Sequence, residues 1–336
     1  MACRRHRPGR PMRARERPDG IATEGRTASP RKAGRHRHGR PDGIAPENRT
    51  ARPRKIDDEL RELSRGREEA MPHAHQRTDA VARAHDGTAL AHQRQGSGYP
   101  LVLLAGQANN HHWWDGVRED FDAEHSTITM DYRGTGDSGK PDEHYSTRGF
   151  AEDVIAVLDD LGVDRADVYG TSMGGRVAQW VAARHPERVR RLVLGCTSPG
   201  GPRAVERDGA VRRALAQSDP AAARGALLEL MFAPAWLAEH PGPHPVLGDP
   251  DMPPHARRRH LVASNEHDAW DVLPLITAPT LILHGDEDRL TPPDNAELLA
   301  SRIPDARVRL LAGARHAYFR ERRGEAGALV ADFLAG

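Results

Sequence analysis

The sequence ADVYGTSMGGRVAQWVAARH, residues 166–185, decides which fold this chain of 336 residues adopts. It begins with a short apolar run, continues with the pentapeptide Gly170-Thr171-Ser172-Met173-Gly174, and ends with the apolar spacing of a helix. Glycines on both sides of a serine permit a sharp turn, because neither carries a Cβ that would collide with closely packed backbone. The stretch therefore predicts a buried strand, a tight turn that presents Ser172, and a helix.

Similar apolar runs recur along the chain and alternate with helical stretches. Six strands are predicted, at residues 99–105, 126–131, 166–170, 190–195, 280–284 and 307–311. Four helices are predicted, at residues 146–161, 173–185, 293–303 and 317–334. A hairpin is predicted from residues 80–85 and 88–93 around Asp86-Gly87. Alternating strands and helices indicate an α/β fold with a mostly parallel sheet flanked by helices.

One interval breaks this alternation. Residues 196–278 separate two neighbouring predicted strands and combine mixed helical character with many prolines. A segment of that length is too long for a loop, so we predict a helical cap inserted into a core of residues 71–195 and 279–336. The cap contains bulky apolar side chains that either line a substrate pocket or pack the cap onto the core: Met231, Phe232, Trp236 and Trp270.

The first seventy residues differ in composition from the rest. They carry 20 Lys and Arg against 11 Asp and Glu, a net charge of +9, and no aromatic residue. Residues 17–32 (RPDGIATEGRTASPRK) nearly recur as residues 40–55 (RPDGIAPENRTARPRK), and neither copy has an apolar face to stack. We interpret residues 1–70 as a disordered tail. The alternatives are a basic tail that contacts nucleic acid or an anionic surface, and a natural start at Met71.

Composition excludes several function classes. Residues 71–336 carry 29 Lys and Arg against 37 Asp and Glu, a net charge of −8, which argues against nucleic acid as the main partner. Two cysteines, Cys3 and Cys196, are too few for a disulfide framework or a four-ligand zinc site. The sequence has no run of 18 apolar residues and no secretory signal, so we expect a cytoplasmic protein without a membrane span. The oligomeric state is not readable from the sequence.

Polar side chains that follow three of the predicted strands are suited to nucleophilic catalysis. Ligands of open α/β sheets bind beyond the carboxyl ends of the strands. Ser172, Asp288 and His316 follow the third, fifth and sixth predicted strands. A serine hydroxyl needs a base and the base needs an orienting acid, so we assign these roles to His316 and Asp288. Asp286 and Asp294 are the alternative acids.

A site for acyl transfer also needs donors for the oxyanion of its transition state. We expect two backbone N–H groups to supply them, one from Met173 and one from Gln107 in the loop after the first predicted strand. Gly170 and Gly174 are assigned a structural role, because the absence of a Cβ lets the predicted helix and strand approach each other closely at the turn.

The remainder of the Gln107 loop contains two tryptophans and two histidines. Trp113 and Trp114 are predicted at the start of a helix, where Trp113 either walls the pocket or packs in the core. His111 and His112 are interpreted as polar residues at the start of that helix, and we predict no metal site.

These motifs resemble those of the α/β-hydrolase fold superfamily, in its cap-bearing serine esterase and lactonase branch. Four landmarks occur in order: the oxyanion loop, the sequence DYRGTGDS at residues 131–138, the Gly-x-Ser-x-Gly nucleophile elbow, and the late Asp and His turns. They cover most of residues 80–334 except the cap. The family usually has His-Gly in the oxyanion loop, where this chain has Ala105-Gly106. We expect residues 131–138 to form a structural turn in which Arg133 belongs to a local ion pair.

The resemblance implies two-step acyl transfer on a small-molecule carboxylic ester or lactone, with no cofactor. Ser172 attacks the carbonyl, His316 takes and returns the proton, and Asp288 fixes the imidazole. The serine at the elbow excludes haloalkane dehalogenases and epoxide hydrolases, which have an aspartate there. The alternatives are a carbon–carbon bond hydrolase, a thioesterase or a cofactor-free haloperoxidase of the same fold. A non-catalytic ligand-binding protein is a further alternative.

Overall fold

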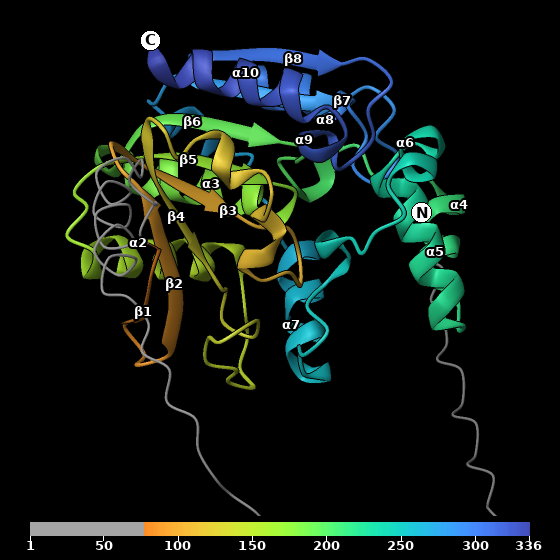
Figure 1. Ribbon diagram of the computed structural model, residues 1–336, viewed down its shortest axis with the longest axis horizontal. Helices are drawn as coiled ribbons and strands as arrows, with labels where there is room; N and C mark the ends of the chain where they lie inside the picture. Colours follow the sequence, from red (N-terminus) through yellow and green to blue (C-terminus); the bar gives the residue numbers. More distant parts are fainter. Residues whose placement is uncertain (1–76) are drawn as a thin grey trace, which may run out of the picture. The chain divides into compact units, whose positions relative to one another are not determined.

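The computed structural model describes residues 77–336; the predictions for residues 1–70 and for Met71 lie outside the described residues. An eight-stranded sheet has the order β1-β2-β4-β3-β5-β6-β7-β8 (Figure 1). The strands are β1 (Thr78–Arg83), β2 (Ala89–Gly96), β3 (Tyr99–Leu104), β4 (His125–Met130), β5 (Ala166–Thr171), β6 (Val189–Gly195), β7 (Thr280–Gly285) and β8 (Ala306–Leu311). β1, β2 and β4 pair antiparallel and the other pairs are parallel.

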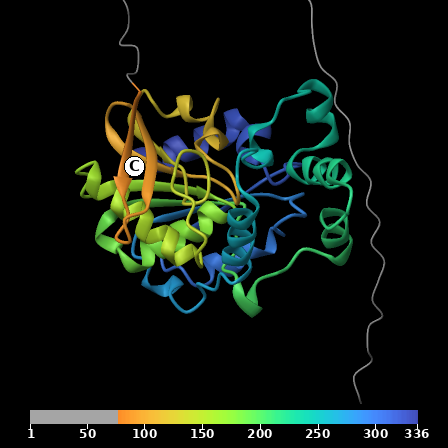
Figure 2. The same cartoon turned by 90° about the horizontal axis from the view of Figure 1, so that it is seen from below.

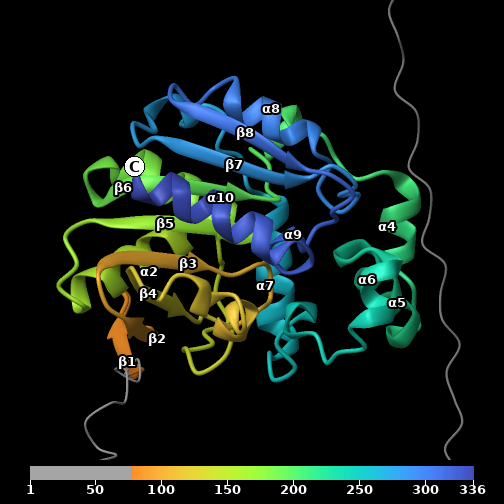
Figure 3. The same ribbon diagram turned by 45° about the horizontal axis from the view of Figure 1, so that its top comes forward.

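Helices cover both faces of this sheet, which confirms the predicted fold class. They are α2 (Thr147–Asp160), α3 (Met173–Arg184), α4 (Gly209–Leu215), α5 (Pro220–Met231), α6 (Pro234–Glu239), α7 (Pro254–Asn265), α8 (Asp294–Ala300), α9 (Tyr318–Glu321) and α10 (Arg323–Ala335). In Figure 3, α10 crosses in front of the strands and α2 lies behind them. Within residues 77–336, no helix is both long and apolar enough to cross a bilayer.

The predicted hairpin is confirmed, with its strands displaced by one to three residues. Gly87 has φ +84°, in the left-handed region that glycine adopts without steric cost. Asp86 Oδ1 accepts the N–H of Thr88 at 2.9 Å, and Arg83 pairs with Ala89 across the turn. The Asp-Gly dipeptide therefore closes the β1–β2 ribbon.

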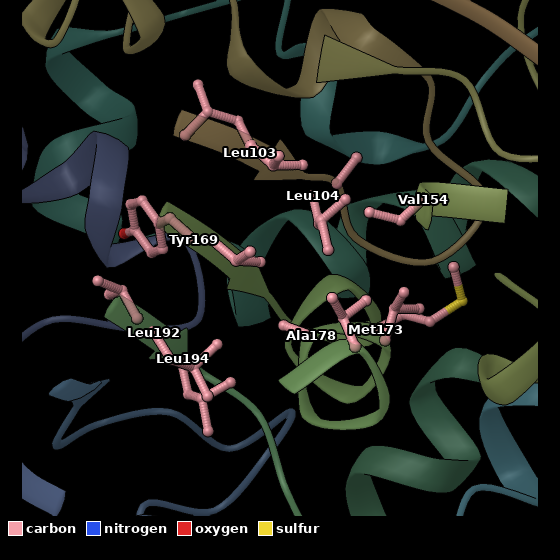
Figure 4. Packing of buried hydrophobic residues seen from close by; sticks show 14 of the residues in the cluster. Leu103, Leu104, Val154, Tyr169, Met173, Ala178, Leu192 and Leu194 are labelled. Carbon is pink, nitrogen blue, oxygen red and sulfur yellow. The ribbon is translucent and has the colours of Figure 1, made fainter. Parts of the chain in front are cut away.

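Burial along the strands follows their place in the sheet. Every residue of β4, β5 and β7 is buried, as expected for strands covered on both faces. The expectation of a similarly buried strand at residues 307–311 is wrong, because β8 is the edge of the sheet and Leu310 is 51% exposed. The side chains of alternate residues pack on opposite faces of the central strands; Figure 4 shows Leu103, Leu104, Tyr169, Leu192 and Leu194 with helix residues Val154, Met173 and Ala178.

Two helix predictions are corrected. The helix predicted over residues 317–334 is broken at Arg322, where φ −117° and ψ 40° are not helical, into α9 and α10. Trp113 and Trp114 do not start a helix. They end a short 3₁₀ turn, His111–Trp114, whose first residues are capped by the Asn110 side chain.

The long interval between β6 and β7 contains α4, α5, α6 and α7. The arrowheads of β6, β7 and β8 point toward α4, α5 and α6 in Figure 1, and Figure 2 shows these three helices to one side of the strands. α4, α5 and α6 therefore lie beyond the carboxyl ends of the parallel strands, where ligands of such sheets bind.

Candidate active site

Ser172 occupies a strained turn between β5 and α3. Its φ of 56° and ψ of −121° lie where a residue with a Cβ is rarely found, at a cost of about 1–3 kcal/mol. The turn is held from both sides, because Ser172 N–H donates to Gly195 O at 2.9 Å and Thr197 Oγ1 donates to Ser172 O at 2.8 Å. Surrounding contacts thus enforce a backbone geometry that the sequence motif predicts.

The flanking glycines are required by close backbone packing. A Cβ added at Gly170 would collide with the carbonyl oxygen of Gly174, and a Cβ at Gly174 with the carbonyl oxygen of Leu104. Each contact brings α3 close to β5 or β3 at the point where Ser172 is presented. A residue with a Cβ at either position would therefore push α3 away from the strands.

His316 and Asp288 form a buried pair. His316 Nδ1 lies 2.8 Å from Asp288 Oδ2, and the two residues are 1% and 2% exposed. An ionised carboxylate only accepts hydrogen bonds, so the imidazole proton of this pair is on Nδ1. His316 Nε2 is then the basic atom, and it is buried with no partner among the described residues.

The loop after β7 fixes the Asp288 carboxylate. Its Oδ1 accepts the backbone N–H groups of Leu290 and Thr291 at 2.8 and 2.9 Å. Burial raises the pKa of the Asp288 carboxyl, but the charge of His316 and hydrogen bonds from His284 and His316 outweigh that effect. The pKa lies well below its usual range, so Asp288 stays ionised beside the imidazole.

A second histidine on Asp288 was missed by the sequence reasoning. His284, on β7, is fully buried, with Nε2 3.2 Å from Asp288 Oδ2 and 2.8 Å from Thr291 O. A carbonyl oxygen only accepts, so the proton is on Nε2, and this single N–H faces Thr291 O at the shorter distance and the Asp288 carboxylate at the longer one. The only sequence signal was the spacing of four residues from Asp288.

The alternative acids do not contact His316 in the described structure. Asp286 is exposed and accepts the N–H of Gly313 at 2.7 Å. Asp294 is the first residue of α8, where a carboxylate stabilises the helix N-terminus. Of the three candidates, the structure brings Asp288 to the imidazole.

Ser172 and the Asp288–His316 pair lie at the same edge of the sheet. Thr171 pairs with Gly195, and Gly195 with Leu283, so β5, β6 and β7 end side by side. Cys196, directly after β6, lies close to both Ser172 and Asp288. Burial and the Asp288 charge raise the pKa of its thiol, and a hydrogen bond from the Ser172 N–H lowers it. No hydrogen bond joins Ser172 Oγ to His316 Nε2 within residues 77–336.

The expected oxyanion loop is supported by residues that sequence reasoning did not single out. Gln107 is followed by Ala108, whose φ is 57°, and Ala108 O accepts the N–H of Asp249 at 2.7 Å. Gly248 N–H donates to Asn109 Oδ1 at 2.9 Å. The segment between α6 and α7 therefore holds this loop, in which the family's usual His-Gly is replaced.

His260 on α7 provides a further support for the loop. Its Nε2 is 2.9 Å from Arg133 O, so Nε2 carries the proton and Nδ1 accepts the N–H of Ala108 at 3.4 Å. Burial lowers the pKa of His260 to about 4. The neutral ring is the form that can accept from Ala108.

The aromatic and apolar residues considered for a pocket are mostly buried. Trp113 is 2% exposed, donates to Thr171 Oγ1 at 2.9 Å and packs against Gly106. These contacts favour core packing over a place in the pocket wall. Met231 and Phe232 are 2% and 0% exposed, and the Phe232 ring stacks on Trp236 with centroids 4.3 Å apart.

The end of α5 is attached to the loop of the catalytic histidine candidate. The N–H of His316 donates to Leu230 O at 3.4 Å, and that of Ala317 to Met231 O at 2.9 Å. The Glu321 carboxylate accepts backbone N–H groups from both sides, Ala233 at 2.9 Å and Arg315 at 2.8 Å. Residues 230–233 thus hold the segment that carries the imidazole.

The turn at residues 131–138 is structural, and the expected ion pair of Arg133 is confirmed. Arg133 bonds both Asp153 oxygens, at 2.6 and 2.7 Å, and Asp86 at 2.6 Å. A hollow of about 700 Å³ beside it is lined by these residues and by one side of α2 along its length, and none of the triad candidates lines it.

Both histidines of the Gln107 loop are engaged by carboxylates: His111 Nδ1 lies 2.9 Å from Asp131 and His112 Nδ1 2.6 Å from Asp115. Burial lowers the pKa of His111, but the hydrogen bond and charge of Asp131 dominate and raise it. The two rings are thus tied to local acids in the part of the chain that the structure describes.

Comparison with known proteins assigns the chain to a protein family. A family model described as "alpha/beta hydrolase fold" matches residues 99–322. A putative carbamate hydrolase of Azorhizobium caulinodans is 32% identical over 250 residues, 70% of this chain and 91% of that protein. A 2-hydroxymuconate semialdehyde hydrolase of Pseudomonas putida is 31% identical over 256 residues, 72% and 89% of the two chains. An esterase structure from Exiguobacterium antarcticum aligns with a TM-score of 0.67 at 25% identity, over 77% of this chain and 100% of the esterase.

Proposed function

Because this chain belongs to the α/β-hydrolase fold family and the two relatives described above are named as hydrolases, we propose that it hydrolyses a carboxylic ester or lactone through Ser172, His316 and Asp288. The observation that carries this proposal is the buried His316–Asp288 pair. Nε2 of this imidazole has no partner among residues 77–336 and lies at the sheet edge where Ser172 is held in a strained turn.

The proposed reaction has two steps. In the first, His316 Nε2 takes the Ser172 hydroxyl proton while Oγ attacks the carbonyl carbon, and the backbone N–H groups of Gln107 and Met173 bind the oxyanion. Collapse breaks the bond to the alcohol, which receives that proton, and leaves an acyl-serine. In the second, His316 takes a proton from water, the hydroxide attacks the acyl carbon, and the acid is released as Ser172 regains its proton. Asp288 orients the imidazole throughout and stabilises the imidazolium that forms within each step.

The segment between β6 and β7 has a defined part in this proposal. We assign residues 196–278 the role of a cap, since α4, α5 and α6 lie beyond the strand ends and the segment holds both the Gln107 loop and the His316 loop. The substrate is a small molecule that enters between this cap and the core. The mechanism requires no cofactor and no metal, and a cytoplasmic location remains a prediction from the sequence.

A second candidate activity is hydrolysis of a carbon–carbon bond. The 31% identity to a 2-hydroxymuconate semialdehyde hydrolase favours it, because a serine, a histidine and an aspartate serve either bond. Relative rates on a vinylogous diketone and on p-nitrophenyl esters distinguish the two activities.

Active-site labelling tests the proposal directly. We expect a fluorophosphonate to modify Ser172, identified by mass spectrometry, and p-nitrophenyl esters to be hydrolysed. Ser172→Ala is expected to lower kcat by about 10⁴–10⁶ if the three residues act as a unit. Ester hydrolysis that survives in Ser172→Ala contradicts the assignment. Tight ligand binding with neither turnover nor labelling points to a non-catalytic binding protein.

A further inference from the structure

Asn109 is a buried amide in the Gln107 loop that has no part in the reaction proposed above. It lies two residues after Gln107 and is 4% exposed. Its Nδ2 donates to Gln107 O at 2.8 Å, and its Oδ1 accepts the N–H of Gly248 at 2.9 Å. A carbonyl oxygen only accepts and a backbone N–H only donates, so one orientation of the amide satisfies both. Asn109 therefore joins the Gln107 loop to the segment between α6 and α7.

The peptide group that follows Gln107 is held at both ends. Its carbonyl, Gln107 O, accepts from Asn109 Nδ2, and its N–H, that of Ala108, donates to His260 Nδ1 at 3.4 Å. A peptide group is planar, and in its trans form the C=O and N–H point in opposite directions. Rotation of this group would therefore break both hydrogen bonds.

The peptide group that precedes Gln107 is oriented by the same residue. Its carbonyl, Gly106 O, accepts the backbone N–H of Asn109 at 3.3 Å. Because this peptide is also trans, the N–H of Gln107 points away from Asn109. That N–H makes no hydrogen bond to another of the residues 77–336. An N–H that is fixed in direction and lacks an acceptor is suited to bind an oxyanion.

The segment that Asn109 contacts is itself anchored to the core. Asp249, next to Gly248, is 3% exposed, and its N–H donates to Ala108 O at 2.7 Å. The Asp249 carboxylate accepts the N–H of Gly136, in the turn at residues 131–138, at 2.7 Å. Its other oxygen accepts the N–H of Asp251 at 3.0 Å. The Asn109 amide is thus attached to a point that is fixed against two other segments.

A local turn explains only part of these contacts. Asparagine side chains commonly bond backbone groups two residues away, as Asn109 does at Gln107 O. That role does not require the bond to Gly248, which is 139 residues away in the chain. Ala108 has φ 57°, a left-handed conformation that a residue with a Cβ keeps only when its surroundings enforce it. The bonds to both peptide groups beside Gln107 supply that enforcement.

We propose that Asn109 is a positioning residue of the oxyanion hole, which ties the peptides on both sides of Gln107 to the cap so that the Gln107 N–H faces the developing charge. This inference rests on the proposed function, because an oxyanion forms only if Ser172 attacks a carbonyl group. Donors that are oriented before the reaction stabilise the charge without rearranging. Loss of Asn109 is therefore expected to slow the chemical step and to leave ground-state binding unchanged.

Replacement of Asn109 by leucine tests this role in the full-length protein. Leucine has a similar volume and makes neither side-chain hydrogen bond. With p-nitrophenyl butanoate as substrate, we expect Asn109→Leu to lower kcat by about 10–100-fold and to leave KM within about twofold.

Asn295→Leu is the matched control. Asn295 is fully buried and joins α8 to Val205 through hydrogen bonds of its amide at 2.8 and 3.0 Å. The control therefore removes an equally buried bridging amide that has no bond to the Gln107 loop. We expect a similar loss of stability in urea for both variants, with kcat of Asn295→Leu within about threefold of the wild type.

A trifluoromethyl ketone separates positioning from folding. Ser172 Oγ adds to the carbonyl carbon of 1,1,1-trifluorooctan-2-one, its proton passes to His316 Nε2, and the π electrons of the carbonyl bond become a lone pair on the oxyanion. We expect the inhibition constant to rise in Asn109→Leu by the factor by which kcat/KM falls, because both depend on the oriented N–H. A merely structural contact would not weaken the ketone selectively while KM stays constant.

A smaller change keeps the test valid if Asn109→Leu does not fold. Asn109→Ser retains a polar side chain that turns accept, but its hydroxyl reaches at most one of the two partners. The same pattern is expected, with a loss of about 3–10-fold in kcat. The inference is overturned if the folded variant keeps wild-type kcat and ketone inhibition, if the loss lies in KM alone, or if Asn295→Leu loses as much. A wild-type protein that neither hydrolyses the ester nor reacts with a fluorophosphonate refutes the proposed function, whereas an active wild type with an unaffected variant refutes this inference alone.

Discussion

Replacement of Asp288 by asparagine tests the proposed site most sharply, because its four contacts determine how the amide must lie. In the wild type, Oδ1 accepts two backbone N–H groups, and Oδ2 accepts the imidazole N–H of His316 and lies 3.2 Å from His284 Nε2. In the Asp288→Asn variant, the amide oxygen must take the place of Oδ1, because an NH₂ group there would face two donors. The amide NH₂ then faces both imidazoles.

This orientation has a calculable consequence for His316. To accept from the amide, Nδ1 must lose its proton, and the neutral ring then carries the proton on Nε2. In that tautomer the imidazole cannot take the Ser172 proton. In Ser-His-Asp enzymes, the same substitution lowers kcat by about 10⁴. We expect a loss of that order for Asp288→Asn, with a much smaller change in KM.

The assay is the steady-state release of p-nitrophenolate, together with the rate of fluorophosphonate labelling at Ser172. Asp286→Asn is the matched control: it makes the same chemical change two residues away, at an exposed carboxylate whose contact with Gly313 N–H an amide oxygen preserves. We expect its kcat to stay within about twofold. Asp288→Asn with more than a tenth of wild-type activity, or an equal loss in Asp286→Asn, refutes the reasoning.

Three further predictions concern stability. Gly174→Ala places a Cβ against the carbonyl oxygen of Leu104 and is expected to cost about 2–4 kcal/mol in urea unfolding, whereas Gly225→Ala, with open space around it, stabilises α5 by about 0.5–1 kcal/mol. Because the unfolded-state pKa of His260 is about 6.5 and burial lowers the folded pKa to about 4, only the unfolded chain binds that proton between these values. Stability is therefore lost as pH falls through this window, by up to about 3 kcal/mol, and His260→Gln removes that part of the pH dependence. Glu321→Ala releases two backbone N–H groups and is expected to cost about 1–3 kcal/mol and to lower kcat; an unchanged kcat argues against its hold on the imidazole segment.

Local sequence predicted those parts of the molecule that depend on near neighbours. The run from Ala166 to Arg184 was assigned correctly as strand, turn and helix, because glycines at 170 and 174 and the apolar spacing act over a few residues. The break at Arg322 was missed because the apolar spacing continues across it while the backbone does not. Edge exposure of β8 was also missed, since the order of strands is not a local property.

Sequence alone determined the order of strands and helices along the chain and the turn at Ser172, because backbone sterics and burial of apolar faces operate over short separations. Only tertiary structure decided which carboxylate meets His316. Asp286 and Asp288 are equivalent by pattern, but two backbone N–H groups in the loop after β7 aim Asp288 at the imidazole. Tertiary packing likewise brought His260 on α7 to the Gln107 loop, because residues so far apart in the chain share no local spacing that would predict the contact.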